Sequence, residues 1–353
     1  MRSQRGSVII IVLWTSILLT VLVTVMAGKV QLSARTAFHN QQAVTDLADV
    51  ASAMAMAEME LILEPMEEPI DYLPATDDLG NPRLPAHRFN GQPLTLQYPA
   101  GEEMVVRIYD HAGKINLNRL DRRGMQLLLE FWLGPDADPR QVQEHLDAWG
   151  DWVDLNDLAA INGADTDYYE SLDPPYTPRN YPELDTVEEL RLIRGFDELF
   201  KDVNLEAAFT IYGSNETVNL NLATREAMRL LPGLNDELIE EIIAWRQTRD
   251  FANRNDVGEL VPLENFVELS NWIGNNTSSY FSVYAYPKAQ SQRDAEAAAQ
   301  DTGDEEDVTP EADPVTQAYM EIMEFRNRAA RGRVYMVDPY ARLPDTAPPR
   351  VQE

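Results

Sequence analysis

The first 63 residues constrain the fold more than any other part of the chain. An apolar run from Val8 to Ala27 follows the short basic start 1–6. A helix rises about 1.5 Å per residue, so roughly 20 apolar residues span a bilayer. No proline or glycine occurs from Val30 to Leu63, where good helix formers dominate. The sequence therefore predicts one helix over 7–63, whose half at 7–28 crosses a membrane.

The residues before the apolar run predict a processing site. Arg2 and Arg5 precede Gly6, and Ser7 opens the helix. An ordinary secretory signal has a shorter apolar core that ends at a small-residue cleavage site. A glycine between a basic leader and an apolar helix is instead typical of a site for type IV prepilin peptidase. We interpret 1–6 as a leader and Ser7 as the mature N-terminus, with a plain membrane anchor as the alternative.

The second half of this helix carries an apolar stripe. Its side chains recur at three- and four-residue steps, which places them on one helical face. A helix that is half in lipid and half in water can use such a stripe to pack on other subunits. We predict that the partner-binding residues are Leu47, Val50, Met54 and Leu61.

Composition narrows the function classes. The 353 residues carry a formal net charge of −30 and no cysteine. Such an acidic surface repels nucleic-acid phosphates. The four histidines form no pair at zinc-ligand spacing, and the sequence has no nucleotide loop, nucleophile elbow or catalytic triad signature. We therefore predict a protein that is not an enzyme and does not bind nucleic acid.

Strand-like patterns occur in two regions that are far apart in the sequence. The expected strands are Leu94–Tyr98, Met104–Tyr109, Tyr280–Tyr286, Ala318–Phe325 and Arg333–Val337. The residues between the second and third strands are mostly helical in pattern. The predicted fold class is α+β, in which a long N-terminal helix accompanies an antiparallel sheet that a large helical domain interrupts.

This prediction divides the chain into parts. The segments 64–119 and 278–338 form one split α/β head, and 120–277 form the inserted helical domain. The segment 289–315 is acidic and has no aromatic residue, so it cannot bury enough apolar surface to offset its ordering entropy. We interpret it as a disordered loop, with a docking tail for a basic partner as the alternative, and 339–353 as a mobile tail.

The predicted insert contains an internal repeat. Ile115–Asn118 reads Ile-Asn-Leu-Asn, and Val218–Asn221 reads Val-Asn-Leu-Asn. In each case a methionine and a pair of leucines follow at the same offsets. The repeat predicts that the insert consists of two related helical units.

The second unit raises a DNA-binding alternative. Val218–Leu260 resembles the helix-hairpin-helix modules of bacterial DNA-uptake proteins, whose Gly-x-Gly hairpin meets a phosphate. Here the hairpin reads Gly233-Leu234-Asn235, so the second glycine is missing. The acidic residues Asp236, Glu237, Glu240 and Glu241 crowd the place where the phosphate would lie. We interpret the module as a fold without DNA-binding activity.

A cluster of oxygen-bearing side chains occurs in the first unit. The segment 151–157 contains Asp151, Asp154, Asn156 and Asp157, and Asp165 follows the turn at Gly163. Ca²⁺ takes six to eight oxygen ligands in flexible geometry, which this cluster can supply. Helix caps and solvated loop acids are the alternative interpretation.

Taken in order along the chain, these motifs resemble the minor pseudopilin K family of type II secretion. The resemblance rests on the leader Gln4–Gly6, the long helix and the segments Asp110–Asn118, Asp151–Asp154, Gly163–Tyr169, Pro174–Asn180, Glu189–Gly195 and Val218–Asn221. It implies a pseudopilin fold and structural calcium, with Glu189 joining the cluster residues as a ligand. Asp165 stands where the family is expected to have glutamate, which shortens the reach of that carboxylate.

The resemblance also implies a place and partners. It implies a single-pass protein of the Gram-negative inner membrane whose periplasmic head lies at the tip of a pseudopilus. There it would initiate and cap assembly and so support the export of folded proteins across the outer membrane. The implied partners are the minor pseudopilins I and J, the major pseudopilin, prepilin peptidase and the secretin or cargo.

The residue Ile11 in the apolar helix favours a position at the tip. Most pilin-like subunits carry glutamate at the fifth mature residue, whereas this chain has Ile11. A carboxylate in lipid needs a partner, and a subunit at the tip has none above it. A minor pilin that primes a type IV pilus, or acts in adhesion, is the alternative function.

Overall fold

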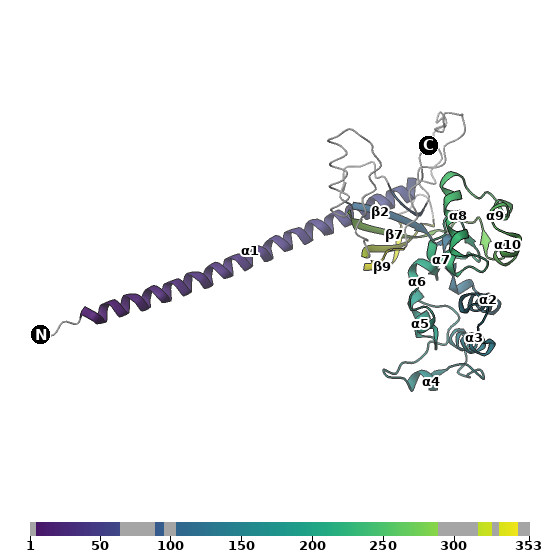
Figure 1. Ribbon diagram of the computed structural model, residues 1–353, viewed down its shortest axis with the longest axis horizontal. Coiled ribbons are helices and arrows are strands. Elements are labelled where there is room, and N and C mark those ends of the chain that lie inside the picture. The colour runs from purple at the N-terminus through teal and green to yellow at the C-terminus, as the bar shows by residue number, and fades with distance from the viewer. Residues whose placement is uncertain (1–4, 64–88, 95–103, 289–316, 327–331, 345–353) are drawn as a thin grey trace, which may run out of the picture. The chain divides into compact units, whose positions relative to one another are not determined.

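The computed structural model describes residues 5–63, 89–94, 104–288, 317–326 and 332–344 (Figure 1). The predicted acidic loop 289–315 lies outside these residues, as do 1–4, most of the expected strand 94–98 and the tail from 345. The chain divides into two compact units, 1–52 and 53–353.

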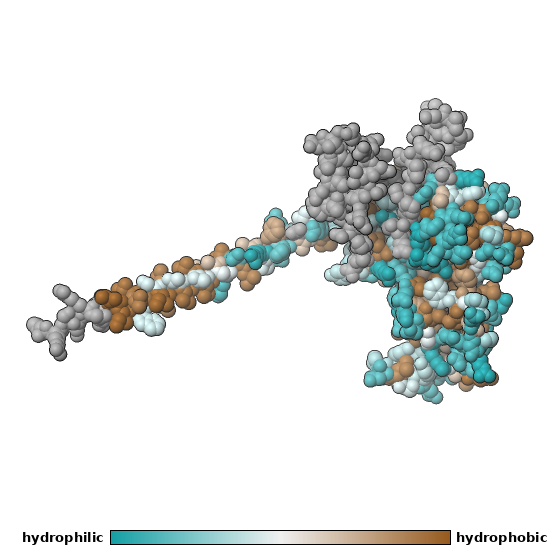
Figure 2. Space-filling view, viewed as in Figure 1, coloured by the Kyte–Doolittle hydropathy of each residue, from teal (hydrophilic) through white to brown (hydrophobic). Residues whose placement is uncertain are grey.

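Helix α1, Arg5–Leu63, is continuous. The absence of helix breakers over 30–63 accounts for its length. From Ile9 onward, this helix is long and apolar enough to cross a membrane. Figure 2 shows the corresponding change along α1, from mostly brown side chains near its start to teal ones further along.

The last turns of α1 belong to the second unit and are buried there. Ala53, Met54, Ala57 and Leu61 are at most 5% exposed, and Glu58 Oε1 accepts a hydrogen bond from the Gly332 amide at 2.9 Å. The prediction that Met54 and Leu61 bind partners is therefore wrong, because the chain covers both side chains itself. Of the predicted stripe, Leu47 is exposed and Val50 is half-buried.

The second unit contains a five-stranded antiparallel sheet in the order β1-β2-β7-β8-β9. Its strands are β1 Asn90–Pro93, β2 Met104–Asp110, β7 Tyr280–Pro287, β8 Gln317–Glu324 and β9 Arg333–Arg342. The α+β class, with a long helix and an antiparallel sheet, is thus confirmed. The first strand precedes the expected one at 94–98, and β9 continues to Arg342, four residues into the predicted tail.

The helical residues lie between two neighbouring strands of this sheet. β2 pairs with β7 in antiparallel register, with Asp110 opposite Phe281, so the chain leaves the sheet at Asp110 and returns at Tyr280. The longer helices between them are α2 Arg122–Leu133, α3 Pro139–Val153 and α8 Asp236–Thr248. The shorter ones are α4 Thr166–Glu170, α5 Phe196–Leu199, α6 Leu205–Ala208, α7 Arg225–Leu230, α9 Arg254–Leu260 and α10 Leu263–Leu269. Figure 1 shows these helices gathered beside the sheet.

Polar side chains begin most of these helices. Asp121 caps α2 by accepting from the Gly124 amide, and Asp138 caps α3 ahead of Pro139. Thr224 caps α7 and Asn235 caps α8, while Asn253 and Asp256 form a reciprocal capping box on α9. Each cap satisfies an amide that has no partner within its helix.

One hydrophobic core runs through the whole insert. It includes Leu128, Trp149, Phe196, Met228 and Ile242. Ile115 and Leu117 also belong to it, because β3 Ile115–Asn116 pairs with β4 Phe209–Thr210 inside the insert. The structure therefore places the border between head and insert near Asp110, whereas the sequence prediction set it at residue 119.

The two Asn-Leu-Asn segments occupy matching positions. β3 pairs in parallel with β4, and β5 Val218–Asn219 pairs in parallel with β6 Ile273–Gly274. Asn118 donates to the Leu184 carbonyl and accepts from the Leu184 amide. Asn221 makes the same pair of hydrogen bonds with Phe251. Each unit thus opens on a short strand and uses its second asparagine to hold a later loop.

Candidate functional site

A buried polar network joins the insert to the sheet. Asp110 Oδ1 accepts hydrogen bonds from the amides of Ala112 at 2.8 Å and Ser278 at 3.0 Å, so one carboxylate holds both ends of the insert. His111 lies between Thr210 Oγ1 at 2.7 Å and Ser282 Oγ at 2.8 Å. These contacts assign a structural role to the segment Asp110–Asn118.

Lys114 is the buried cation of this junction. Its side chain is 2% exposed, and its Nζ donates to Ser282 Oγ at 2.9 Å. Burial lowers the pKa of Lys114 to about 8, against the pull of nearby carboxylates that include Glu206. Burial, and then the charge of Lys114, lower the pKa of His111 well below its usual value. The buried histidine is therefore neutral at pH 7.

At Gly113 the start of the insert packs tightly against the backbone of the second helical unit. A Cβ placed there would lie 2.2 Å from the carbonyl oxygen of Leu222, a backbone atom of the second helical unit. The Gly113 carbonyl also accepts from the Thr224 amide at 3.4 Å. Only glycine fits this contact between the start of the insert and its second unit.

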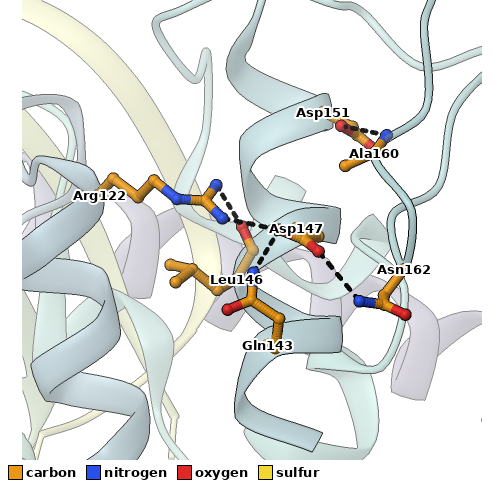
Figure 3. A network of polar contacts seen from close by, with 7 residues as sticks. All are labelled: Arg122, Gln143, Leu146, Asp147, Asp151, Ala160 and Asn162. Atoms are coloured by element: carbon orange, nitrogen blue, oxygen red, sulfur yellow. Dashed lines mark hydrogen bonds and ion pairs between the residues drawn. The ribbon is translucent and has the colours of Figure 1, made fainter. Parts of the chain in front are cut away.

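Carboxylates of α3 hold the loop that follows this helix. Asp147 accepts from Arg122 and Gln143, both at 2.6 Å, and from Asn162 at 3.4 Å (Figure 3). Asp151 accepts from the amide of Ala160 through both carboxylate oxygens, at 3.1 and 3.0 Å. The predicted ligand Asp151 thus fixes the backbone of this loop.

Two of the predicted calcium ligands lie together at the end of the loop. Asp157 Oδ1 and Asp165 Oδ1 both accept from the Thr166 amide, at 3.4 and 2.9 Å. The amide of Asn180 donates to Asp165 Oδ1 at 3.0 Å. Burial and the neighbouring Asp157 raise the pKa of Asp165, while hydrogen bonds from Thr166 and Asp165 lower that of Asp157.

The other predicted ligands have separate partners. Asp154 accepts from Asn156, through its backbone at 3.0 Å and its side chain at 2.7 Å, and Asn156 Oδ1 accepts from the Leu158 amide. Glu189 Oε1 accepts from Arg179 at 3.0 Å and from the Asp185 amide at 2.9 Å. Because Arg179 adjoins Asn180 in the chain, Glu189 and Asp165 are held by consecutive residues.

Three buried oxygens of this region have no hydrogen-bond donor in the described part of the chain. They are Asp165 Oδ2, Asn180 Oδ1 and Glu189 Oε2. Carboxylate and amide oxygens are the ligands that Ca²⁺ prefers, so these residues fit a calcium ion by chemistry. Across the described residues, however, no three His, Asp or Glu side chains converge closely enough to hold a metal. Any calcium ion here would need amide, backbone or water oxygens as well.

Sequence reasoning did not assign two important groups of this region. Asn180 has a left-handed backbone with φ 48°, and its side chain contacts Asp165. The only sequence signal for Asn180 is its place at the end of the segment Pro174–Asn180, which belongs to the family resemblance. The contact of Arg122 with Asp147 had no signal in the sequence, because α2 and α3 meet only in the fold.

Comparison with known proteins identifies the first helical unit. Residues 113–203 match the family model described as type II secretion system (T2SS), protein K. Over these residues the chain is similar to the protein K family. The match begins within the buried junction and ends beyond Glu189, so it includes the whole candidate calcium region.

Two relatives extend this comparison. The type II secretion system protein K of Klebsiella pneumoniae is 27% identical over 142 residues, which make up 37% of this chain and 43% of that protein. The match thus spans less than half of that protein K. The crystal structure of the GspK-GspI-GspJ complex from the enterotoxigenic Escherichia coli type 2 secretion system covers 86% of this chain and 98% of the solved chain, with 15% identity and a TM-score of 0.49.

Proposed function

We propose that this chain is a minor pseudopilin at the tip of the type II secretion pseudopilus, where it initiates and caps assembly. The match of residues 113–203 to the protein K family carries the proposal. Helix α1 supports it, because an exposed apolar helix at the N-terminus can anchor a subunit in the inner membrane and pack on other subunits. The role is mechanical, without an enzymatic reaction.

The proposal includes an orientation and partners. Arg2 and Arg5 precede the apolar run, and basic residues favour the cytoplasmic side, which would leave the head in the periplasm. The sequence resemblance names the minor pseudopilins I and J as neighbours in the tip. Leu47 and Val50 are the residues of the predicted stripe that remain accessible for them.

Assembly tests this function directly. We expect the full-length chain, co-expressed with the minor pseudopilins I and J of the same bacterium and extracted in mild detergent, to elute with both from a sizing column. Changing Leu47 and Val50 together to glutamate should weaken the complex, because charge replaces apolar contact on the helix. The control variant Leu263→Glu alters an equally apolar side chain on α10. Separate elution of three folded proteins would contradict the tip role and favour a type IV minor pilin.

Processing at Gly6 is a further part of the proposal. We expect Gly6→Leu to leave the full-length precursor in the membrane, because the bulky side chain blocks prepilin peptidase next to the cleaved bond. N-terminal sequencing of the wild-type chain should begin at Ser7. A Gly28→Leu variant, which changes a glycine with open space around it, serves as the control. Cleavage at another bond, with Gly6 dispensable, would contradict this assignment.

We also propose that the candidate region binds structural calcium, which Asp165, Asn180 and Glu189 help to hold. A ligand bound only by the folded state stabilises it by RT ln(1 + [L]/Kd), about 2.7 kcal/mol at a hundredfold excess over Kd. Calcium should therefore raise the melting temperature relative to chelator. We expect Asp165→Asn to remove most of this shift, because Asp165 Oδ2 is buried without a donor. The exposed neighbour in Asp167→Asn is the matched control. Identical melting curves in calcium and chelator would mean that these acids serve only as caps and loop contacts.

A further inference from the structure

Three large aliphatic side chains stand exposed in one short loop of the insert. Leu155, Leu158 and Ile161 are 73%, 78% and 101% exposed. They lie between α3 and α4 at three-residue steps, and we call them the apolar loop. Single exposed aliphatic residues are common on soluble proteins. Three within seven residues of the chain are uncommon, and exposed apolar surface concentrated in one segment marks interaction sites.

Polar contacts fix the backbone of the apolar loop. The Asn156 side chain accepts from the Leu158 amide at 2.9 Å, and Asp151 holds the Ala160 amide (Figure 3). Arg194 donates to the Gly163 carbonyl at 3.1 Å, just beyond Ile161. The loop is therefore preorganised with its aliphatic side chains in solvent. A preorganised surface loses little conformational entropy when a partner binds.

The charges around the apolar loop select the kind of partner. Between residues 151 and 173 the chain has seven Asp and Glu residues and no Lys or Arg. Arg194 adds one positive charge from outside this segment, through its contact with the Gly163 carbonyl, so acidic side chains still outnumber basic ones. Asp167 and Glu170 are exposed beside the loop in sequence. Like charges repel, which disfavours an anionic lipid surface and also a second copy of a chain with net charge −30. An apolar groove with a basic rim is complementary to such a surface.

We propose that the apolar loop is a docking surface for a protein partner whose apolar groove is bordered by lysine or arginine side chains. Leu155, Leu158 and Ile161 enter the groove, and the surrounding carboxylates face its basic rim. This contact lies on the insert and is additional to the packing of α1 on other subunits. It does not depend on the tip position proposed above.

Photo-crosslinking in cells tests the docking surface. The probe is benzoylphenylalanine, incorporated at Leu158 of the full-length chain. Incorporation at Leu263 provides the matched control, because Leu263 is also 78% exposed and is followed by the acidic residues Glu264 and Glu268. We expect a protein adduct from position 158 that position 263 does not give. Sequencing of the adduct should place the crosslinked residue of the partner protein in an apolar segment flanked by lysine or arginine.

Charge reversal completes the test. Asp167→Lys combined with Glu170→Lys should lower the yield of the adduct from position 158 severalfold, whereas Glu264→Lys combined with Glu268→Lys should leave it unchanged. Melting curves of each variant verify that the insert remains folded. An adduct with lipid or with a second copy of the chain would overturn the proposal. Two further results would overturn it. One is an adduct yield from position 158 that is no higher than the yield from position 263. The other is a yield from position 158 that does not change in the variant with Asp167→Lys and Glu170→Lys.

Discussion

Changing Met54 to glutamate will destabilise the head by about 4 kcal/mol or more, because it places a charge in a site that is 5% exposed. Met54 belongs to the last turns of α1, which the second unit covers. The effect should appear as a lower melting temperature and faster proteolysis of the detergent-solubilised chain. Any loss of partner binding in this variant would follow from loss of the fold.

The matched control is the same change seven residues earlier on the helix. Leu47 is 64% exposed, so Leu47→Glu buries no charge within the chain and should leave its stability within about 0.5 kcal/mol of the wild type. Equal melting temperatures for the two variants would contradict the burial of Met54. Under the proposed tip role, Leu47→Glu should weaken partner binding while the fold is kept, because the Leu47 side chain is exposed.

Gly113→Ala should be nearly as disruptive, although it adds a single methyl group. The new Cβ would meet the backbone oxygen of Leu222 at 2.2 Å, and a backbone contact of this kind cannot be relieved by rotating a side chain. We expect a loss of about 3 kcal/mol, at the upper end of the cost of overpacking. Urea unfolding followed by circular dichroism measures the change.

A second glycine provides the control for Gly113. Gly258 lies within α9, and its added Cβ would make ordinary contacts at 3.6 Å with the ring of Phe266. Because alanine favours a helix more than glycine, Gly258→Ala should stabilise the chain by up to about 1 kcal/mol. If Gly113→Ala unfolded no more readily than Gly258→Ala, the close packing of the junction would be refuted.

Local sequence patterns predicted the helices and strands, but they did not predict which surface buries each of them. Helix α1 could be predicted because 30–63 contain no breaker, and β2 and β7 because their strand patterns are strong. The stripe at Leu47, Val50, Met54 and Leu61 has the spacing of an amphipathic helix. Spacing does not tell whether the chain's own head or another subunit buries such a face. The burial of Met54 and Leu61 decides this only in the folded chain.

Polar contacts between residues far apart in the sequence could not be predicted either. The acidic residues near Asp151 were recognisable as a group, yet their hydrogen bonds to Ala160, Asn162 and Thr166 depend on the course of the loop. The junction was harder still, since Asp110 meets Ser278 across most of the insert. The segment Asp110–Asn118 stood out through the family resemblance, and the fold supplies its physical reason in the buried network.

The pairing of Asp110 with Phe281 means that the insert takes the place of a hairpin turn. β2 and β7 are adjacent antiparallel strands, and adjacent antiparallel strands need only a two-residue turn to connect them. A short Asn-Gly turn in place of residues 111–280 would therefore restore an uninterrupted hairpin. Closing so short a loop costs little entropy. The insert can thus be regarded as an enlarged hairpin loop between two strands that share one antiparallel register.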